Sequence, residues 1–322
     1  MTNSIICLDG YALNPGDISW APFESLGSLT VHARTREQDV VERCAGARYV
    51  LTNKTPLART TLEALTDLAY VGVLATGFNI VDIEAACEQG VVVTNVPTYG
   101  TDSVAQHVAA LMLRWARPIG VHAQAVGQGE WARSPDWCFS LSPIDSLAGL
   151  TLGIVGVGRI GRAVARIAAA MDMRVVGHDV YWPAENQLDT LQIDRVDLDT
   201  LFRESDVISL HCPLTDENTH LVNDRRLALA KPTALLINTS RGPLVDEIAL
   251  ADALRNGGIG AAALDVLEVE PPALNHPLAG LDNCVITPHI AWYARSARQR
   301  LMGLAAENLR RFMDGTACNQ VN

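Results

Sequence analysis

Three polar side chains in the C-terminal part of the chain are of types suited to acid–base chemistry. Arg241, Glu270 and His289 each lie just past an apolar run that predicts a β-strand. An arginine grips a carboxylate or a polarised carbonyl through paired hydrogen bonds. A histidine titrates at about 6.5 and exchanges protons near neutral pH, and a neighbouring glutamate would orient its ring. Taken singly, each also has a commoner structural interpretation, as a loop cation, a surface acid and a core histidine.

A glycine triplet in the middle of the chain has the spacing of a phosphate-binding turn. Gly156, Gly158 and Gly161 follow the apolar run 152–155 and open an Ala-rich stretch that ends near Met171. The first glycine permits the turn, the second lets backbone approach a pyrophosphate, and the third lets the helix pack on the strand. Amides at the start of that helix would face the phosphates. The predicted cofactor loop comprises Gly156, Gly158, Arg159, Ile160 and Gly161.

An acid at the end of the next apolar run indicates which dinucleotide is bound. The run 174–177 leads to Asp179, whose carboxylate can accept hydrogen bonds from both hydroxyls of the adenosine ribose. A 2′-phosphate there would meet the negative charge of the aspartate, so the sequence favours NAD over NADP. Arg174 stands before the end of the strand and is not interpreted as a phosphate clamp. The alternative interpretation of Asp179 is a solvated strand-end acid.

Two further strand ends are candidates for ligand contacts, because open α/β sheets bind ligands at the carboxyl ends of their strands. One is the stretch 211–215, where a proline stops the strand, and the other is 238–242, where a glycine follows Arg241. A plain exit from strand to loop is the alternative interpretation of 211–215. The predicted cofactor contacts at these ends are Cys212, Pro213 and Thr239.

Together with a nicotinamide, Arg241, Glu270 and His289 suit the reduction of a 2-oxo acid. Hydride would go to the carbonyl carbon of the substrate, and His289 would supply the proton. Arg241 would steady the developing oxyanion. The combination predicts an oxidoreductase.

Length and composition exclude several other classes of protein. A chain of 322 residues with 48% hydrophobic and 19% charged residues is ordinary for a globular α/β protein, and its length predicts two domains. A net charge of −11 argues against nucleic-acid binding, which requires clustered lysine and arginine. No apolar run approaches the roughly 20 residues that span a bilayer, so we expect no membrane partner.

The N-terminus and the cysteines favour a cytoplasmic location. The stretch 1–4 lacks the charged region and the cleavage pattern of a signal peptide. The seven cysteines are scattered, with no Cys-x-x-Cys pair. This pattern predicts reduced thiols, with neither a disulfide framework nor a metal site.

Alternating apolar runs and helical stretches in the first hundred residues predict a parallel sheet covered on both faces. This first domain would end near Tyr99, and a long helix over 102–115 would follow, capped by Asp102 or Thr101 and ended by Pro118. The expected strands of the first domain are 5–8, 29–32, 49–51, 70–74 and 91–94, and its expected helices include 62–68 and 83–88.

The stretch 127–143 predicts an arm rather than a compact element. It carries Trp131, Trp137 and Phe139 among glycine, serine and proline residues. One interpretation is a dimer contact, because aromatic side chains favour interfaces. The other is a loop folded on its own domain.

A second sheet begins at Leu152, and its first crossover carries the apolar stripe of a helix that lies on a sheet. The last segment, 295–313, is amphipathic and could return to pack on the first domain. The further expected strands of the second sheet are 174–177, 207–210, 234–237, 261–264 and 285–287.

Over essentially its whole length the chain resembles the D-2-hydroxyacid dehydrogenase family. The resemblance is carried by the glycine triplet with Asp179, by the stretches 238–242 and 287–291, and by 265–272. It implies that Arg241 binds substrate, that Glu270 pairs with His289, and that His289 is the acid/base. It also implies that Asp265 belongs to the NAD site.

The same resemblance implies a domain arrangement. We expect two Rossmann-like or flavodoxin-like parallel-sheet α/β domains, with the NAD domain inserted into the substrate domain. The substrate domain would comprise 1–100 and 289–322, and the NAD domain would comprise 101–288 and carry the dimerisation arm. The resemblance further implies a homodimer built largely on the NAD domain.

Other stretches are similar to one subgroup, the glycerate dehydrogenases or hydroxypyruvate reductases. These stretches are 9–11, 51–56, 101–107 and 289–292. Asn53 and Lys54 either help to read a hydroxymethyl group or are ordinary loop residues. Phe78 and the arginine-bearing stretch 293–296 depart from the subgroup pattern and leave the chemistry intact. The stretch 74–79 resembles the family loop whose amides hold the substrate carboxylate, which implies substrate contacts at Ala75, Thr76 and Gly77.

The predicted function is therefore the NAD-linked interconversion of hydroxypyruvate and D-glycerate, with glyoxylate and glycolate as a further pair. One alternative is another D-2-hydroxyacid dehydrogenase, of the D-lactate or phosphoglycerate type. The alternative from a different class is an NAD-sensing binding module without enzymatic activity.

Overall fold

The computed structural model describes residues 3–188 and 191–322. The chain divides into two compact units by its internal contacts. Unit 1 consists of Met1–Gly100 and Trp292–Asn322, and unit 2 consists of Thr101–Ala291.

The second crossing between the units lies slightly later than the boundary after residue 288 that we expected. It follows Ala291 because the segment around His289 is bonded to unit 2. The amide of His289 donates to the carbonyl of Asp265, and the amides of Ile290 and Ala291 donate to the Asp265 carboxylate.

Unit 1 is built on a five-stranded parallel sheet with the strand order β2-β1-β3-β4-β5. Its strands are β1 (Ser4–Cys7), β2 (Ser28–Val31), β3 (Tyr49–Thr52), β4 (Tyr70–Val73) and β5 (Val92–Thr94). All residues of β3 and β4 are buried, as expected for parallel strands covered on both faces.

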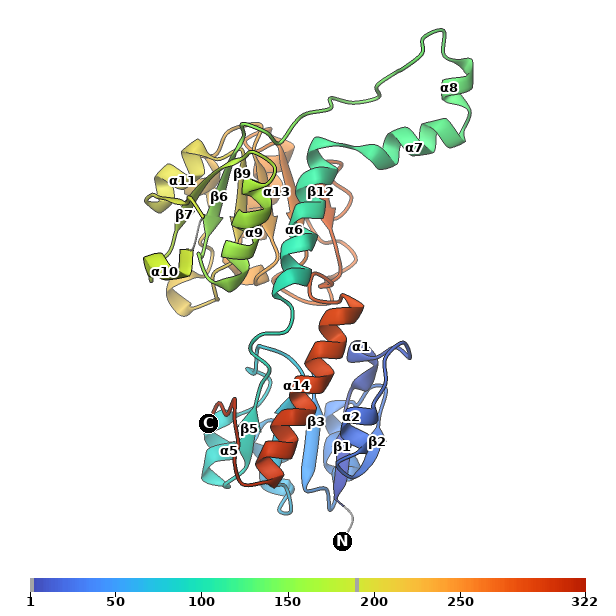
Figure 1. Cartoon of the computed structure of the whole chain (residues 1–322), viewed down its shortest axis with the longest axis vertical. Coiled ribbons are helices and arrows are strands. Elements are labelled where there is room, and N and C mark those ends of the chain that lie inside the picture. The colour runs from blue at the N-terminus through green and yellow to red at the C-terminus, as the bar shows by residue number, and fades with distance from the viewer. Residues whose placement is uncertain (1–2, 189–190) are drawn as a thin grey trace. The chain divides into compact units, whose positions relative to one another are not determined.

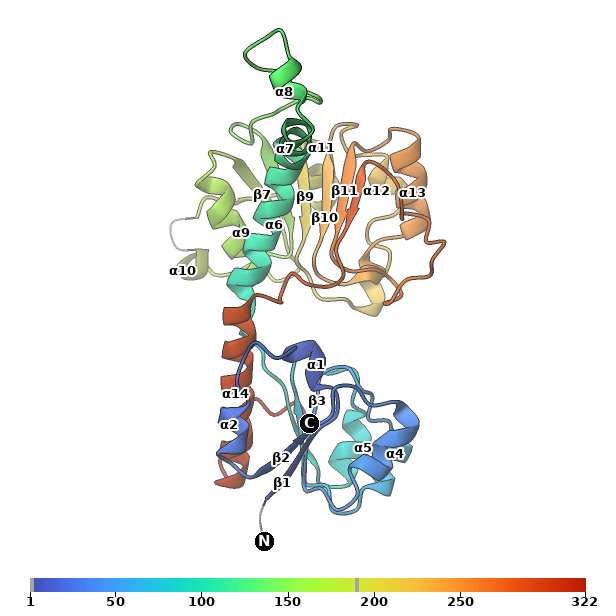
Figure 2. The same cartoon turned by 90° about the vertical axis from the view of Figure 1, so that its right-hand side faces the viewer.

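Helices cover both faces of this sheet, and successive strand residues face opposite cores. Ile6 of β1 packs with α3, α4 and α5, whereas Ile5 packs with α2 and α14. The labelled helices on the two faces of the sheet can be followed in Figures 1 and 2. The helices of unit 1 are α1 (Gly10–Leu13), α2 (Ala21–Glu24), η1 (Glu37–Asp39), α3 (Val40–Arg43), α4 (Arg59–Ala64), α5 (Ile83–Glu88) and α14 (Arg295–Met313). The prediction of a helix over 62–68 was wrong in position, because Leu65 leaves the helical conformation with φ −101° and ψ 67°.

Unit 2 is built on a seven-stranded parallel sheet with the order β12-β11-β10-β9-β6-β7-β8. Its strands are β6 (Thr151–Val155), β7 (Arg174–His178), β8 (Asp194–Arg195), β9 (Val207–Leu210), β10 (Leu235–Asn238), β11 (Ala261–Leu264) and β12 (Cys284–Ile286). The two residues of β8 are exposed and polar, so no apolar run predicted this strand. The predicted fold class, two parallel-sheet α/β domains, is confirmed.

Two layers of helices cover the sheet of unit 2. One core contains α6 and α9, which lie side by side, and the other core contains α11, α12 and α13 (Figures 1 and 2). The helices are α6 (Thr101–Ala116), α7 (Ile119–Gly127), α8 (Glu130–Arg133), α9 (Arg159–Ala169), α10 (Glu185–Leu188), α11 (Leu198–Glu204), η2 (Asp216–Asn218), α12 (Asp224–Leu227), η3 (Gly242–Leu244) and α13 (Glu247–Arg255). Among the described residues, no helix combines the length and apolarity needed to cross a membrane.

The register of the unit 2 strands aligns their carboxyl ends. Val155 of β6 is opposite Leu210 of β9, and Leu210 is opposite Asn238 of β10. Asn238 is in turn opposite Leu264 of β11, which is opposite Ile286 of β12. The residues that follow these five strands therefore share one edge of the sheet. The candidate catalytic residues Arg241, Glu270 and His289 lie in the segments that follow β10, β11 and β12.

An arm extends from unit 2 beyond its sheet and helical layers (Figure 1). It contains α7 and α8, which the sequence did not predict as helices. The apolar side chains of the arm are strongly exposed, with Ile119 at 73%, Trp131 at 53% and Trp137 at 86% of their surface accessible. Such a surface on an extended arm is typical of a contact with another chain.

Candidate active site

His289 and Glu270 form a close hydrogen-bonded pair at the carboxyl edge of the unit 2 sheet. Nδ1 of His289 lies 2.6 Å from Oε2 of Glu270, and both side chains are about one-third exposed. The other carboxylate oxygen of Glu270 accepts from the amide of Leu267 at 3.0 Å. Because Nδ1 faces a carboxylate, Nε2 is the ring nitrogen left to exchange a proton with a substrate.

A buried acid, Asp265, fixes the segment that carries His289. One of its carboxylate oxygens accepts from the hydroxyl of Thr287 at 2.6 Å and from the amide of Ile290 at 2.9 Å. The other oxygen accepts from the amide of Ala291 at 2.7 Å. His289 itself has a left-handed backbone with φ 53°, which is uncommon in a residue other than glycine. Asp265 therefore positions the histidine through three hydrogen bonds.

The first turns of α6 hold the same segment from another side. The hydroxyl of Ser103 donates to the carbonyl of Ala291 at 2.6 Å. Nε2 of His107 lies 3.2 Å from the hydroxyl of Thr287. These positioning roles are not predicted from the sequence, in which the stretch 101–107 is marked only by its resemblance to one subgroup.

Arg241 lies in the turn that follows β10, with an exposed side chain. Its guanidinium donates to the carbonyl of Ser240 at 2.7 Å, and its own carbonyl accepts from the side-chain amide of the buried Asn238 at 2.8 Å. The next residue, Gly242, packs directly against backbone, because an added Cβ would stand 1.9 Å from the carbonyl carbon of Leu267. The Arg241 turn is thus seated on the start of the loop that carries Glu270.

The glycine triplet combines two tight backbone contacts with one open position. A Cβ on Gly156 would lie 2.5 Å from the amide nitrogen of Cys212, and its φ of 97° is left-handed. A Cβ on Gly161 would lie 2.2 Å from the carbonyl oxygen of Gly156. Gly158, at the N-cap of the 11-residue α9, has open space where its Cβ would stand. Backbone amides there are accessible to an anion.

Asp179 directly follows β7, and its side chain is hydrogen-bonded to the glycine turn. Its carboxylate accepts from the amide of Val157 at 2.6 Å and from the amide of Tyr181 at 2.9 Å. Each oxygen keeps a further lone pair for a hydroxyl group. Arg174, at the opposite end of β7, is engaged with Asp194 at 3.1 Å and with Glu204 at 3.0 Å.

The candidate substrate loop lies in unit 1, after β4. The hydroxyl of Thr76 donates to the carbonyl of Val96 at 2.9 Å, and the carbonyl of Thr76 accepts from the side chain of Asn95 at 2.7 Å. Asn53 is only 3% exposed, and its side-chain amide donates to the carbonyl of Leu74 at 2.6 Å. Asn53 therefore holds the backbone at Leu74, directly before the loop 75–77, which favours its interpretation as a structural residue.

Comparison with known proteins decides the family. The sequence model described as "D-isomer specific 2-hydroxyacid dehydrogenase, NAD binding domain" matches residues 109–291, more than half of the chain. The chain belongs to this family. The predicted resemblance is confirmed, and the protein is an NAD-dependent dehydrogenase of D-2-hydroxy acids.

Individual relatives match this dehydrogenase over most of its length. A hydroxypyruvate reductase from Blautia hydrogenotrophica is 45% identical over 321 residues, which cover 99% of each chain. A glycerate dehydrogenase from Methylorubrum extorquens is 40% identical over 286 residues, which cover 88% of each chain. The crystal structure of the TT0316 protein from Thermus thermophilus has 35% identity and a TM-score of 0.85, covering 99% of this chain and 100% of that one.

The strand ends of the dehydrogenase fit its NAD cofactor. The Thr239 hydroxyl is buried without a hydrogen-bond partner among the described residues, as expected of a group that bonds a ligand. Burial raises the pKa of the Cys212 thiol to about 11, so this thiol is neutral at pH 7. Both groups are uncharged and follow the carboxyl ends of β9 and β10, and the amides at the start of α9 suit the charge of a pyrophosphate.

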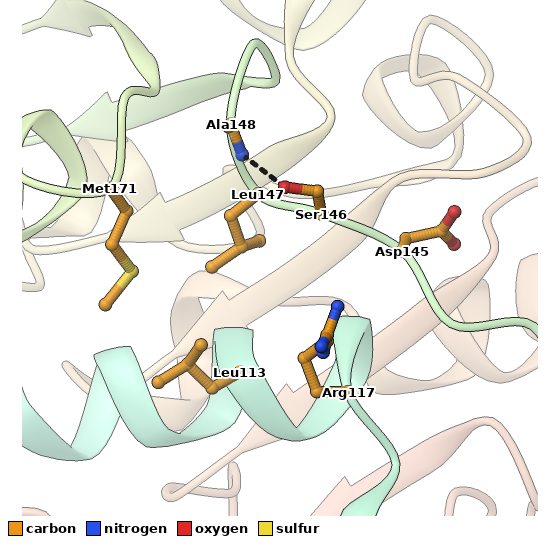
Figure 3. A pocket seen from close by; sticks show the side chains of 7 residues that line it. All are labelled: Leu113, Arg117, Asp145, Ser146, Leu147, Ala148 and Met171. Atoms are coloured by element: carbon orange, nitrogen blue, oxygen red, sulfur yellow. Dashed lines mark hydrogen bonds between the residues drawn. The ribbon is translucent and has the colours of Figure 1, made fainter.

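A pocket of about 220 Å³ lies at the other edge of the same sheet, where β6 and β7 begin (Figure 3). Its polar contacts include a bond from the amide of Ala148 to the hydroxyl of Ser146 at 3.3 Å. Ligands of open α/β sheets bind at the carboxyl ends of strands, so this pocket has no assigned part in the dehydrogenase reaction. It is lined by Leu113, Arg117, Asp145, Ser146, Leu147, Ala148 and Met171.

Proposed function

We propose that this protein interconverts hydroxypyruvate and D-glycerate with NAD(H), and that glyoxylate and glycolate form a second substrate pair. The observation that carries the chemistry is the 2.6 Å contact between His289 and Glu270. The names of the two relatives described above, hydroxypyruvate reductase and glycerate dehydrogenase, support this choice of substrate.

In the proposed reaction each of the three polar residues has a separate task. NADH supplies the hydride that the carbonyl carbon of the substrate receives. The exposed guanidinium of Arg241 binds the carboxylate and the carbonyl oxygen of the 2-oxo acid. His289 donates a proton from Nε2 to that oxygen, while Glu270 offsets the charge of the ring through Nδ1. In the reverse direction Nε2 accepts the hydroxyl proton.

The proposed binding residues are of two kinds, substrate contacts and cofactor contacts. Unit 1 provides the substrate loop Ala75, Thr76 and Gly77, and unit 2 provides the cofactor site. NAD is preferred over NADP because the Asp179 carboxylate suits a ribose hydroxyl and repels a 2′-phosphate. The proposed cofactor residues are Gly156, Gly158, Arg159, Ile160, Gly161, Asp179, Cys212, Pro213, Thr239 and Asp265.

Steady-state rates over a panel of 2-oxo acids, with NADH and NADPH compared, test the proposal. We expect the highest kcat/KM for hydroxypyruvate with NADH, followed by glyoxylate. His289→Asn should lower kcat by about 10²- to 10⁴-fold and leave the Kd for NADH within twofold. Unchanged turnover in this variant would contradict the role of His289. A highest rate with pyruvate or with a phosphorylated 2-oxo acid would favour another branch of the family, and NADH binding without turnover would favour a sensing module.

We further propose that the protein is a cytoplasmic homodimer joined through the α7–α8 arm. The exposed Ile119, Trp131 and Trp137 support the interface, and seven free cysteines suit a reducing compartment. Trp137→Asp should convert a dimer into a monomer in sedimentation equilibrium. Val41→Asp, at a 39% exposed position on α3, is the matched control and should stay dimeric. A wild-type protein that sediments as a monomer would refute the dimer.

A further inference from the structure

A second, more deeply buried histidine–glutamate pair is hydrogen-bonded to the loop that carries Glu270. Oε2 of Glu247 lies 2.9 Å from Nε2 of His276, and each side chain is only 10% exposed. The other oxygen of Glu247 accepts from the amide of Glu268 at 2.8 Å. Glu268 and His276 stand on either side of Glu270 in the sequence, so one buried carboxylate joins both flanks of this loop.

The hydrogen bonds of His276 fix its tautomer. Its Nδ1 accepts from the amide of Leu278 at 3.3 Å, which requires an unprotonated Nδ1. The ring proton is therefore on Nε2 and is donated to Glu247. Both nitrogens of this imidazole are used within the protein, in contrast to His289, whose Nε2 is left for the substrate.

Glu247 is the first residue of α13, but capping this helix is the task of its neighbour. Asp246 is the N-cap, and its carboxylate accepts from the amides of Ile248 at 3.1 Å and Ala249 at 3.0 Å. Both oxygens of Glu247 bond to the Glu270 loop instead. A buried carboxylate is costly unless it is paired, so these bonds at a buried position indicate a specific requirement for it.

The same loop is restrained where it begins. Gly242 of the Arg241 turn packs against Leu267, and Leu267 donates its amide to Glu270. The carboxylate of Glu247 accepts a hydrogen bond from the amide of the next residue, Glu268. The bonds from Glu247 thus set the path of the backbone that presents Glu270 to His289.

We propose that Glu247 and His276 are positioning residues for the reaction, which hold the Glu270 carboxylate against Nδ1 of His289. The inference rests on the proposed acid–base role of His289. Neither residue is assigned contact with substrate or cofactor. Their removal should therefore lower kcat with little effect on the KM for the 2-oxo acid or on the Kd for NADH.

Graded substitutions distinguish the two halves of the pair. Glu247→Ala removes both bonds and should lower kcat about 10- to 100-fold, the cost of a small displacement of a catalytic group. In Glu247→Gln the side-chain oxygen can still accept from the amide of Glu268, but the side-chain NH₂ group faces the Nε2 proton of His276. The decrease in kcat should therefore be smaller than in Glu247→Ala. His276→Gln retains a donor near the Nε2 position and should be closer to wild type than His276→Ala. The control is Asp197→Ala, which removes the cap of α11 and should leave kcat within twofold.

A double-mutant cycle with Glu270→Gln tests whether the effect passes through Glu270. If it does, Glu247→Ala should change kcat less than twofold in the Glu270→Gln background. Losses that multiply in the double variant would overturn the inference.

A spectroscopic readout keeps this test separate from the test of the proposed function. The low-field proton resonance of His289 Nδ1, assigned through its absence in His289→Asn, should shift in Glu247→Ala and stay in place in Asp197→Ala. A wild type inactive with every 2-oxo acid would refute the function, and an unmoved resonance in Glu247→Ala would refute the positioning role.

Discussion

His211 should give the stability of the fold a defined dependence on pH. This residue follows β9, with Nε2 2.9 Å from the hydroxyl of Ser209. Its Nδ1 is buried and has no hydrogen-bond partner among the described residues. Desolvation of the charged imidazolium lowers the pKa of His211 from 6.5 to about 4, so the ring is neutral at pH 7 in the folded protein.

In the unfolded chain the same ring takes up its proton at an ordinary pKa of about 6.5. The unfolded state therefore binds more protons than the folded state between pH 6.5 and about pH 4. The contribution of His211 to stability is full above pH 6.5, falls as the pH decreases through this window, and levels off below it. Its largest change is about 3 kcal/mol in the free energy of unfolding, a substantial part of a typical total of about 5–15 kcal/mol.

Urea unfolding followed by circular dichroism measures this effect in wild type and in His211→Gln. The glutamine can still bond Ser209 but does not titrate, and the carboxylates that also titrate in this range are common to both proteins. Lowering the pH from 7.5 to 4.5 should shift the difference in unfolding free energy by about 2 kcal/mol in favour of the variant. A difference that stays constant within about 0.5 kcal/mol would refute the burial of a neutral ring.

Two further predictions concern the cofactor site. Gly161→Ala places its Cβ 2.2 Å from a carbonyl oxygen and should lower stability by about 1–3 kcal/mol, whereas Gly158→Ala should leave the melting temperature unchanged and weaken NADH binding in calorimetry. A stable Gly161→Ala, or tight NADH binding by Gly158→Ala, would contradict these assignments. Asp179→Ala should raise the Kd for NADH about 10-fold or more and raise the NADPH-to-NADH ratio of kcat/KM, and an unchanged ratio would argue against its role in cofactor choice.

The sheets could be predicted from the sequence because buried parallel strands are short apolar runs. The strands 207–210 and 261–264 and the helix 295–313 have the predicted bounds. The misses have a local cause. The helix near Leu62 ends where Leu65 turns into the core, and β8 pairs through its backbone with no apolar side chain to mark it.

The candidate site was predictable only in part. Glu270 and His289 stand out because each follows an apolar run at the same edge of a parallel sheet, and they lie in hydrogen-bond contact. The residues that hold them carry no such signal. Asp265 stood out only through the resemblance, and Glu247 is indistinguishable in sequence from an ordinary acid in the first turn of a helix. Both carboxylates accept hydrogen bonds from backbone amides that lie more than 20 residues away in the sequence. The spacing of residues in the sequence does not reveal such contacts.

The acids of this site differ in their exposure, and that difference separates positioning from chemistry. Asp265 and Glu247 are buried, and each accepts from at least one backbone amide of a catalytic loop. Glu270 is partly exposed and directs one oxygen to the imidazole of His289. The Glu270 carboxylate stabilises the imidazolium of His289 only while the loops that carry these two residues keep their conformation. The 2.6 Å contact between Glu270 and His289 therefore depends on two buried carboxylates that do not contact the imidazole. Loss of Glu270 should lower kcat by removing the charge beside the imidazole, and loss of Asp265 or Glu247 should lower kcat by displacing the loops.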